Sequence, residues 1–256
     1  MEQNFIMKRL IVLLVIYLSC ISLYAQIDDV YIVNADKLNL REFPNAESKS
    51  HGLLSRGQEV LIIDIAYDWF KVSVGHYEGW LKRSYLIAKP ENLYNRMNLN
   101  TGDSPECDNM DWRYDYGAQG YLEITVGAGA DFAVKVMERN TGLCIRAFYI
   151  KSGESIKVKD IPQNTYYLKV ASGRDFRQGI KDGQCIMVFN QSAHYEIGEE
   201  ILDFNMGPKR IETIDGKRYE VQSVPSYSLR LAVRSRDHSF KDKFDTKTIS
   251  KEEFNK

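Results

Sequence analysis

The stretches Leu38-Asn39-Leu40-Arg41-Glu42-Phe43-Pro44 and GWLKRSYL at residues 79–86 decide the fold of the first part of the chain. In the first stretch, two leucines alternate with polar residues, which is the pattern of a strand with one buried face. Outward from these stretches, short apolar runs recur between Val30 and Ala88, and Asn, Pro, Asp and Gly separate them. Such spacing predicts a small all-β barrel.

Four motifs stand in a fixed order across this region: LNLREFP at 38–44, GLLSRG at 52–57, DWFKV at 68–72 and GWLKRSYL at 79–86. Together they make residues 28–88 resemble a bacterial SH3-like domain (SH3b, SH3 type 3). Phe43 and Asp68 depart from the family pattern, but both are expected in turns, where residue identity matters least to the core. The resemblance implies a barrel that binds a ligand and does not catalyse a reaction.

Exposed aromatic residues are the candidate ligand-binding residues of this domain. In SH3-like barrels aromatic grooves hold extended peptides, and in bacterial relatives the ligand is often a wall peptide. Trp69 and Trp80 can alternatively be packing residues of the core or the barrel lip, and this reading is favoured for them. Arg41 is expected to be a structural brace. The candidates are Tyr67, Trp69, Tyr77, Trp80 and Tyr85.

The N-terminus has the pattern of a secretory signal peptide at residues 1–25. Lys8 and Arg9 precede an apolar run that ends at Ala25. This run is shorter than the roughly 20 residues of a membrane-spanning helix, so no membrane span is expected after cleavage. Cys20 leaves open a lipoprotein, although cleavage after Ala25 is favoured. The sequence therefore predicts export to the periplasm or the cell surface.

The rest of the chain is predicted to contain a second all-β domain. Residues 89–116 are polar and aperiodic and indicate a linker, with Trp112 near its end expected to dock on a folded neighbour. Strand-like runs fill 117–235 and predict an antiparallel β-sandwich. The phrase SGESIKVKDIP at 152–162 makes this domain resemble transthyretin-like, carboxypeptidase regulatory-like sandwiches. Residues 236–256 are expected to be a charged, solvated tail with a short helix near its end.

Three cysteines remain after cleavage, and their spacing fits no zinc site. Cys144 and Cys185 lie in strand-like runs, so a disulfide between them is possible, while buried free thiols are an equally good interpretation. Neither begins a helix, as the nucleophile of a cysteine peptidase does. The four histidines have no partner at metal-ligand spacing. No cofactor and no metal are expected.

Charge excludes one class of partner. Lys and Arg total 34 against 35 Asp and Glu, so no excess of positive charge favours nucleic acid. The sequence predicts a secreted, non-enzymatic envelope protein with an SH3-like domain that binds a peptide, peptidoglycan or protein ligand. The alternatives are a cell-envelope hydrolase with its site in the C-terminal sandwich, or a structural subunit of a surface assembly.

Overall fold

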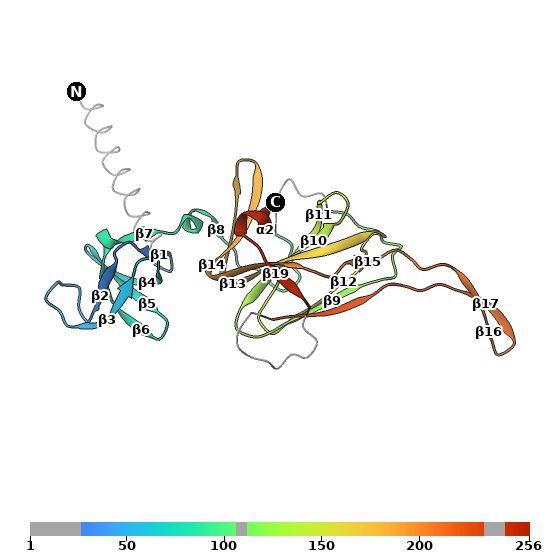
Figure 1. The fold of residues 1–256 in the computed structure, drawn as a ribbon, viewed down its shortest axis with the longest axis horizontal. Coiled ribbons are helices and arrows are strands. Elements are labelled where there is room, and N and C mark those ends of the chain that lie inside the picture. The colour runs from blue at the N-terminus through green and yellow to red at the C-terminus, as the bar shows by residue number, and fades with distance from the viewer. Residues whose placement is uncertain (1–26, 106–111, 233–243) are drawn as a thin grey trace, which may run out of the picture. The chain divides into compact units, whose positions relative to one another are not determined.

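The computed structural model describes residues 27–105, 112–232 and 244–256 (Figure 1). The chain forms two compact units, the first ending at Leu93 and the second beginning at Tyr94. The predicted signal peptide, with Cys20, lies outside the described residues. Within the described residues no helix is long and apolar enough to cross a membrane.

The first unit is one seven-stranded sheet with the strand order β3-β2-β6-β5-β4-β1-β7. Each neighbouring pair in it is antiparallel. Its strands are β1 (Val30–Val33), β2 (Lys37–Arg41), β3 (Ser50–Ser55), β4 (Glu59–Ala66), β5 (Trp69–Val74), β6 (Tyr77–Lys82) and β7 (Leu86–Ala88). Two single-turn 3₁₀ helices, η1 (Arg83–Tyr85) and η2 (Pro90–Leu93), flank β7. The predicted all-β barrel is confirmed.

One hydrophobic cluster fills the inside of this curled sheet. It takes alternate residues from each strand, as the strand period requires: Leu38 and Leu40 from β2, Phe70 and Val72 from β5, and Leu81 from β6. The residues between them point to the other side of the sheet. The alternation in the motifs therefore determines which side chains remain available to a ligand.

The second unit is a β-sandwich, as predicted, with one parallel strand pair. Its larger sheet has the order β11-β10-β13-β14-β19, with β8 and β15 also paired to β13. Its smaller sheet has the order β12-β9-β18, in which β18 runs parallel to β9. The strands are β8 (Asn95–Arg96), β9 (Leu122–Val126), β10 (Asp131–Glu138), β11 (Cys144–Ile150), β12 (Ser155–Val158), β13 (Thr165–Lys181), β14 (Gln184–Gly198), β15 (Leu202–Asp203), β18 (Tyr227–Leu231) and β19 (Thr246–Thr248).

The larger sheet is covered on both faces. Phe132 and Val134 of β10 face the cluster shared with the smaller sheet, whereas Ala133 between them belongs to a second cluster on the opposite face. In that second cluster Phe254 of the C-terminal helix α2 (Lys251–Asn255) is fully buried. Burial on both faces explains why β10 is buried at nearly every position.

Two segments predicted to lie outside the domains are part of this second cluster. The supposed linker is wrong from Tyr94 onward, because β8 pairs with β13 and both Met97 and Leu99 pack into the cluster. Trp112 packs there too, as expected for the docking end of that segment. In the predicted tail the short helix near the end is confirmed as α2, but the segment is not solvated: β19 pairs with β14, and Phe254 is among the most buried side chains of the described residues. The tail residues 236–243 lie outside the described residues.

A Cys144–Cys185 disulfide is not formed. Cys144 carries a free thiol, and Cys185 is disulfide-bonded to another cysteine. Cys144 is on β11 and Cys185 on β14, with β10 and β13 between these strands. Three strand spacings in a sheet amount to about 14 Å, and a disulfide requires Cα atoms no more than roughly 7 Å apart.

A separate hairpin, β16 (Arg210–Ile214) and β17 (Lys217–Val221), extends away from the sandwich (Figure 1). Asp215 and Gly216 form its two-residue turn, and both have positive φ, which suits the turn that joins tightly twisted strands. All of its residues are exposed except the half-buried Val221.

Candidate functional site

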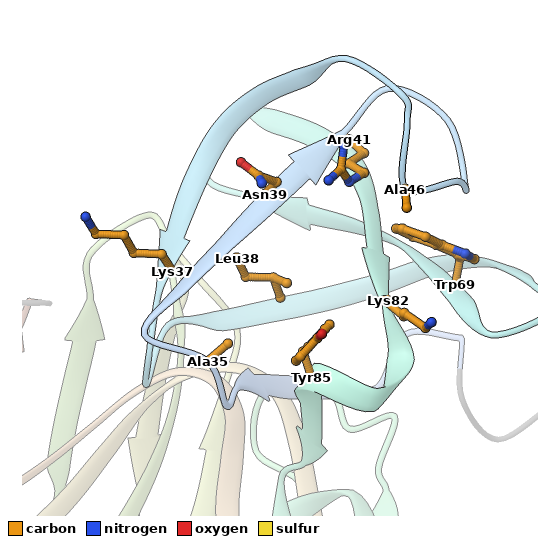
Figure 2. Close-up of a pocket in the computed structure, with 9 residues that line it drawn as sticks. All are labelled: Ala35, Lys37, Leu38, Asn39, Arg41, Ala46, Trp69, Lys82 and Tyr85. Carbon is orange, nitrogen blue, oxygen red and sulfur yellow. The ribbon is translucent and has the colours of Figure 1, made fainter.

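A groove of about 360 Å³ lies on the first unit (Figure 2). It lies where β2 passes the start of β5, the end of β6 and the 3₁₀ turn η1. The residues that line it are Ala35, Lys37, Leu38, Asn39, Arg41, Ala46, Trp69, Lys82 and Tyr85.

The groove combines aromatic surface with positive charge. Trp69 and Tyr85 supply two rings, and Lys37, Arg41 and Lys82 supply three cations. None of the described lining residues is acidic. Asp68 lies 3.6 Å from the Lys82 ammonium in an exposed ion pair. A ligand with a carboxylate or another anionic group would therefore meet net positive charge here.

Strand pairing places the tryptophan in the groove. Trp69 is opposite Lys82 in the β5–β6 ladder, and their neighbours Phe70 and Leu81 are opposite each other and point into the core. Successive residues of a strand point to opposite faces, so burial of Phe70 and Leu81 turns Trp69 and Lys82 outward. The side chain of Trp69 is half-buried and is not part of the hydrophobic core of the unit.

Arg41 has the bracing role predicted for it. Its Nη1 donates to the Ser48 carbonyl at 2.6 Å, which holds the loop between β2 and β3 against the strand. This loop carries Ala46, one of the groove residues. Arg41 thus shapes one wall of the groove and contributes its charge as well.

Tyr67 lies in the turn just before Trp69 and is 98% exposed. Its φ of 55° is in the left-handed region, which is unfavourable for a bulky side chain and natural for Gly or Asn. It does not line the groove, but the turn that it shares with Asp68 adjoins the groove's Trp69 end. An exposed ring held in a strained turn is consistent with a contact residue.

The structure separates the five candidate aromatic residues. Trp69 and Tyr85 lie in the groove, whereas Tyr67, two residues before Trp69 in the chain, does not line it. Tyr77 follows the turn at the opposite end of β5, about 17 Å along the strand. Trp80 points to the outer face of the sheet, opposite Lys71 on β5 and Arg41 on β2, and is not among the groove residues.

Lys37, Asn39 and Lys82 are groove residues that the motif comparison did not single out. Lys37, Asn39 and Arg41 alternate with the two core leucines of β2. Their common face was visible in the sequence as the polar half of that alternation. The proximity of Lys82 and Tyr85 to that face depends on the β2–β6 pairing, which one sequence does not reveal.

The second unit has a smaller hollow of about 80 Å³ beside Gly120 and Phe204, and its lining residues carry no ionisable side chain.

Burial, opposed by nearby Lys135, raises the pKa of the Cys144 thiol to about 11. Its Sγ donates to the Arg146 carbonyl at 3.1 Å. A thiol that remains protonated is a poor nucleophile. No metal-binding group of three or more His, Cys, Asp or Glu side chains occurs among the described residues.

Residues 36–87 match the family model described as bacterial SH3 domain. The match covers about a fifth of the chain and includes every groove residue except Ala35. A search of curated proteins found no match for the chain. The first unit is thus a bacterial SH3 domain, which is a type of binding module.

Proposed function

We propose that this chain is an exported, non-enzymatic envelope protein whose SH3 domain binds an extended ligand carrying carboxylate groups. The ligand class is a peptide, either free or as the peptide part of peptidoglycan, or an extended segment of a protein. Trp69 and Tyr85 would contact the body of the ligand, and Lys37 and Lys82 would contact its carboxylates.

The single observation that carries this proposal is the composition of the groove. Two aromatic rings and three cations line one hollow on a family of domain known for binding. Aromatic grooves favour extended backbones, because flat rings contact a chain that has no internal hydrogen bonds. The cations add selectivity for an acidic chain over a neutral one.

Two observations support export. The first 25 residues have the charge and apolar pattern of a signal peptide. Cys185 is disulfide-bonded, and disulfides persist mainly in oxidising compartments outside the cytoplasm. Cleavage and location can be read directly from the N-terminus of the protein recovered from the cell envelope.

Cosedimentation with purified peptidoglycan tests the ligand. The chain without residues 1–25 would be compared with Trp69→Ala and with Lys37→Glu/Lys82→Glu. We expect each variant to lower the apparent affinity at least about tenfold, the loss typical of a central contact residue. Added salt should weaken the wild type and have less effect on the charge-reversed variant.

Two controls make this result specific to the groove. Tyr77→Ala removes an exposed ring of the same domain at the far end of β5, and Lys181→Glu reverses an exposed charge on the second unit. Both should bind as the wild type does. Retention that is equal for all variants would mean that the groove is not the site. If the wild type were not retained even at low salt, peptidoglycan would be excluded as the ligand.

A further inference from the structure

The β16–β17 hairpin has features of a strand-pairing site. It is a two-stranded sheet with no third strand beside it among the described residues. Ile211, Ile214 and Tyr219 are 64%, 51% and 46% exposed. A two-stranded hairpin without a covered face is only marginally stable in water, and its unpaired edges are templates for another strand.

The register shows which backbone groups are free. Ile214 and Lys217 flank the two-residue turn and are partners, as are Glu212 and Tyr219. In such hairpins the flanking pair is hydrogen-bonded and every second pair after it is too. The amide and carbonyl of Tyr219 therefore point toward β16. Those of Arg218 and Glu220 point to the open edge of β17.

This open edge is complementary to itself. If a second β17 lies antiparallel to the first about a twofold axis at Tyr219, Arg218 of each copy is opposite Glu220 of the other. The free amide and carbonyl of Arg218 then meet those of Glu220, and their side chains, on one face, form two cross-strand ion pairs. The two Tyr219 rings meet as the central, closely spaced pair on the other face.

We propose that two copies of this chain associate through their β17 edges, forming a continuous four-stranded antiparallel sheet. The inference rests on the hairpin alone and does not depend on the proposed ligand of the SH3 domain.

The neighbouring edge does not offer the same fit. The corresponding twofold pairing of β16 places Glu212 opposite Glu212, and like charges directly opposite each other destabilise a sheet. Glu220 already lies 3.1 Å from Lys209 in the same chain, but both side chains are more than half exposed. The carboxylate has a second oxygen for the partner's Arg218.

A charge swap tests the pairing. Sedimentation equilibrium over a concentration series would compare the wild type with Arg218→Glu, Glu220→Arg and the double variant. Each single reversal places like charges opposite each other, so we expect the dimer dissociation constant to rise at least about tenfold. The double variant restores opposite charges in both pairs and should return the dimer dissociation constant close to the wild-type value. A matched control, Glu212→Arg on β16, should leave it unchanged.

Crosslinking gives an independent measurement. Tyr219→Cys places two thiols at the twofold axis, in a closely spaced pair whose Cα separation suits a disulfide. Under mild oxidation we expect a covalent dimer from Tyr219→Cys and none from Glu212→Cys. Failure of Tyr219→Cys to crosslink would overturn the proposal. So would a chain that stays monomeric up to about 1 mM, or a dimer that the single charge reversals do not weaken.

Discussion

At the scale of single residues, Gly79 shows how a family motif translates into packing. The glycine of the GWLKRSYL stretch suggests a tight turn, yet it lies in the middle of β6. A Cβ atom at this position would lie 2.7 Å from Cγ of Leu40 and 2.9 Å from the Arg41 carbonyl oxygen. The glycine is needed because β2 crosses closely over β6, beside the wall of the groove.

Gly79→Ala should therefore destabilise the SH3 domain. The added methyl group must displace Leu40 or the β2 backbone, a form of overpacking that typically costs about 1–3 kcal/mol. Urea unfolding of the chain would measure the decrease. Gly52→Ala is the matched control, because a Cβ there meets nothing within 4 Å. Equal stability of Gly79→Ala and the wild type would contradict the close approach.

Lys135 is a charged residue in the interior of the second unit. Its ammonium donates to the Phe254 carbonyl at 3.0 Å and lies 4.7 Å from the centre of the Phe254 ring. Burial lowers the pKa of Lys135 to about 8, with Lys169 acting in the same direction and Cys144 in the opposite one. The folded protein therefore loses this proton well before the unfolded chain does.

This difference predicts a pH-dependent stability. Between pH 8 and 10.5 the unfolded chain holds more protons at Lys135 than the folded one, so its contribution to the free energy of unfolding rises with pH. Across that range we expect the wild type to gain on the order of 3 kcal/mol relative to Lys135→Met. Urea unfolding of both proteins at several pH values measures this difference in the free energy of unfolding.

The comparison with Lys135→Met also separates this effect from others. The raised pKa of Tyr166 acts in the opposite direction, but the variant retains this group. Because Lys135 lowers the pKa of the Cys144 thiol, both proteins in the comparison should also carry Cys144→Ser. If the difference in the free energy of unfolding between the two proteins did not change with pH, Lys135 would titrate normally in the folded protein.

Which residues form the core of the SH3 domain could largely be predicted, with one informative exception. Leu54, Val60 and Ile62 are buried as the alternation indicates. Ile63, predicted in the core, follows the buried Ile62, so it points away from the core and is only half-buried, whereas a bulge between Ile62 and Asp64 shifts the ladder and brings Ile65 to the core. Alternation locates a strand's faces only until a bulge reverses them.

At the scale of elements, α2 shows how a short helix can complete a core. Ser250 caps its first turn by accepting from the Glu253 amide. Its last carbonyls accept from buried lysines: Lys169 donates to Glu253 at 2.6 Å and Lys135 to Phe254. Positive charge at the carbonyl end of a helix is favourable, so this five-residue helix is stabilised from the sheet that it covers.

Phe254→Ala should lower the stability of the second unit by about 3–5 kcal/mol, the usual cost of truncating a fully buried phenylalanine. The same variant removes the ring that the Lys135 ammonium faces. Glu252→Ala, an exposed change in the same turn, is the control and should stay within about 0.5 kcal/mol of the wild type. Similar unfolding curves for the two variants would place α2 outside the cooperative core.

The long β13–β14 hairpin explains why strands were harder to predict here. The stretch GRDFRQGIKDG suggests a loop because of its glycines, but β13 continues through it to Lys181. A Cβ on Gly173 would lie 2.5 Å from that of Phe189, and one on Gly179 would lie 2.6 Å from Tyr94. Each of these glycines lies where a distant segment approaches the strand closely. In a single sequence, a glycine at such a contact looks the same as a glycine in a turn.

At the scale of the whole molecule, two all-β units could be predicted but their limits could not. Periodicity identifies strands that alternate, and the SH3 motifs add the order of the first unit. Segments with one or two apolar anchors, such as Leu99 in the supposed linker and Phe244 in the supposed tail, resemble solvated chain. Their burial depends on a sheet face that the rest of the unit creates.

The cysteine arrangement gives a prediction for the intact protein. Under native conditions the Cys144 thiol should react slowly with a thiol reagent, because it is half-buried and its pKa is raised to about 11. In denaturant without reductant it should react fully, and Cys144→Ser should remove that signal. Rapid modification of the native wild type at Cys144 would contradict the placement of this residue.

Reduction of the Cys185 disulfide should separately lower the free energy of unfolding by about 2–4 kcal/mol.

The position of α2, after every described strand of the second unit, affects when this unit can fold. Its long central hairpin is built from contacts close in sequence, which form early. The face that includes Ala171 and Phe189 stays uncovered until residues 249–255 have been synthesised, since Ile249 and Phe254 complete that cluster. During synthesis the unit is thus held short of its final stability. If the protein is exported, as we propose, this delay would keep the second unit from folding fully before residues 249–255 are made.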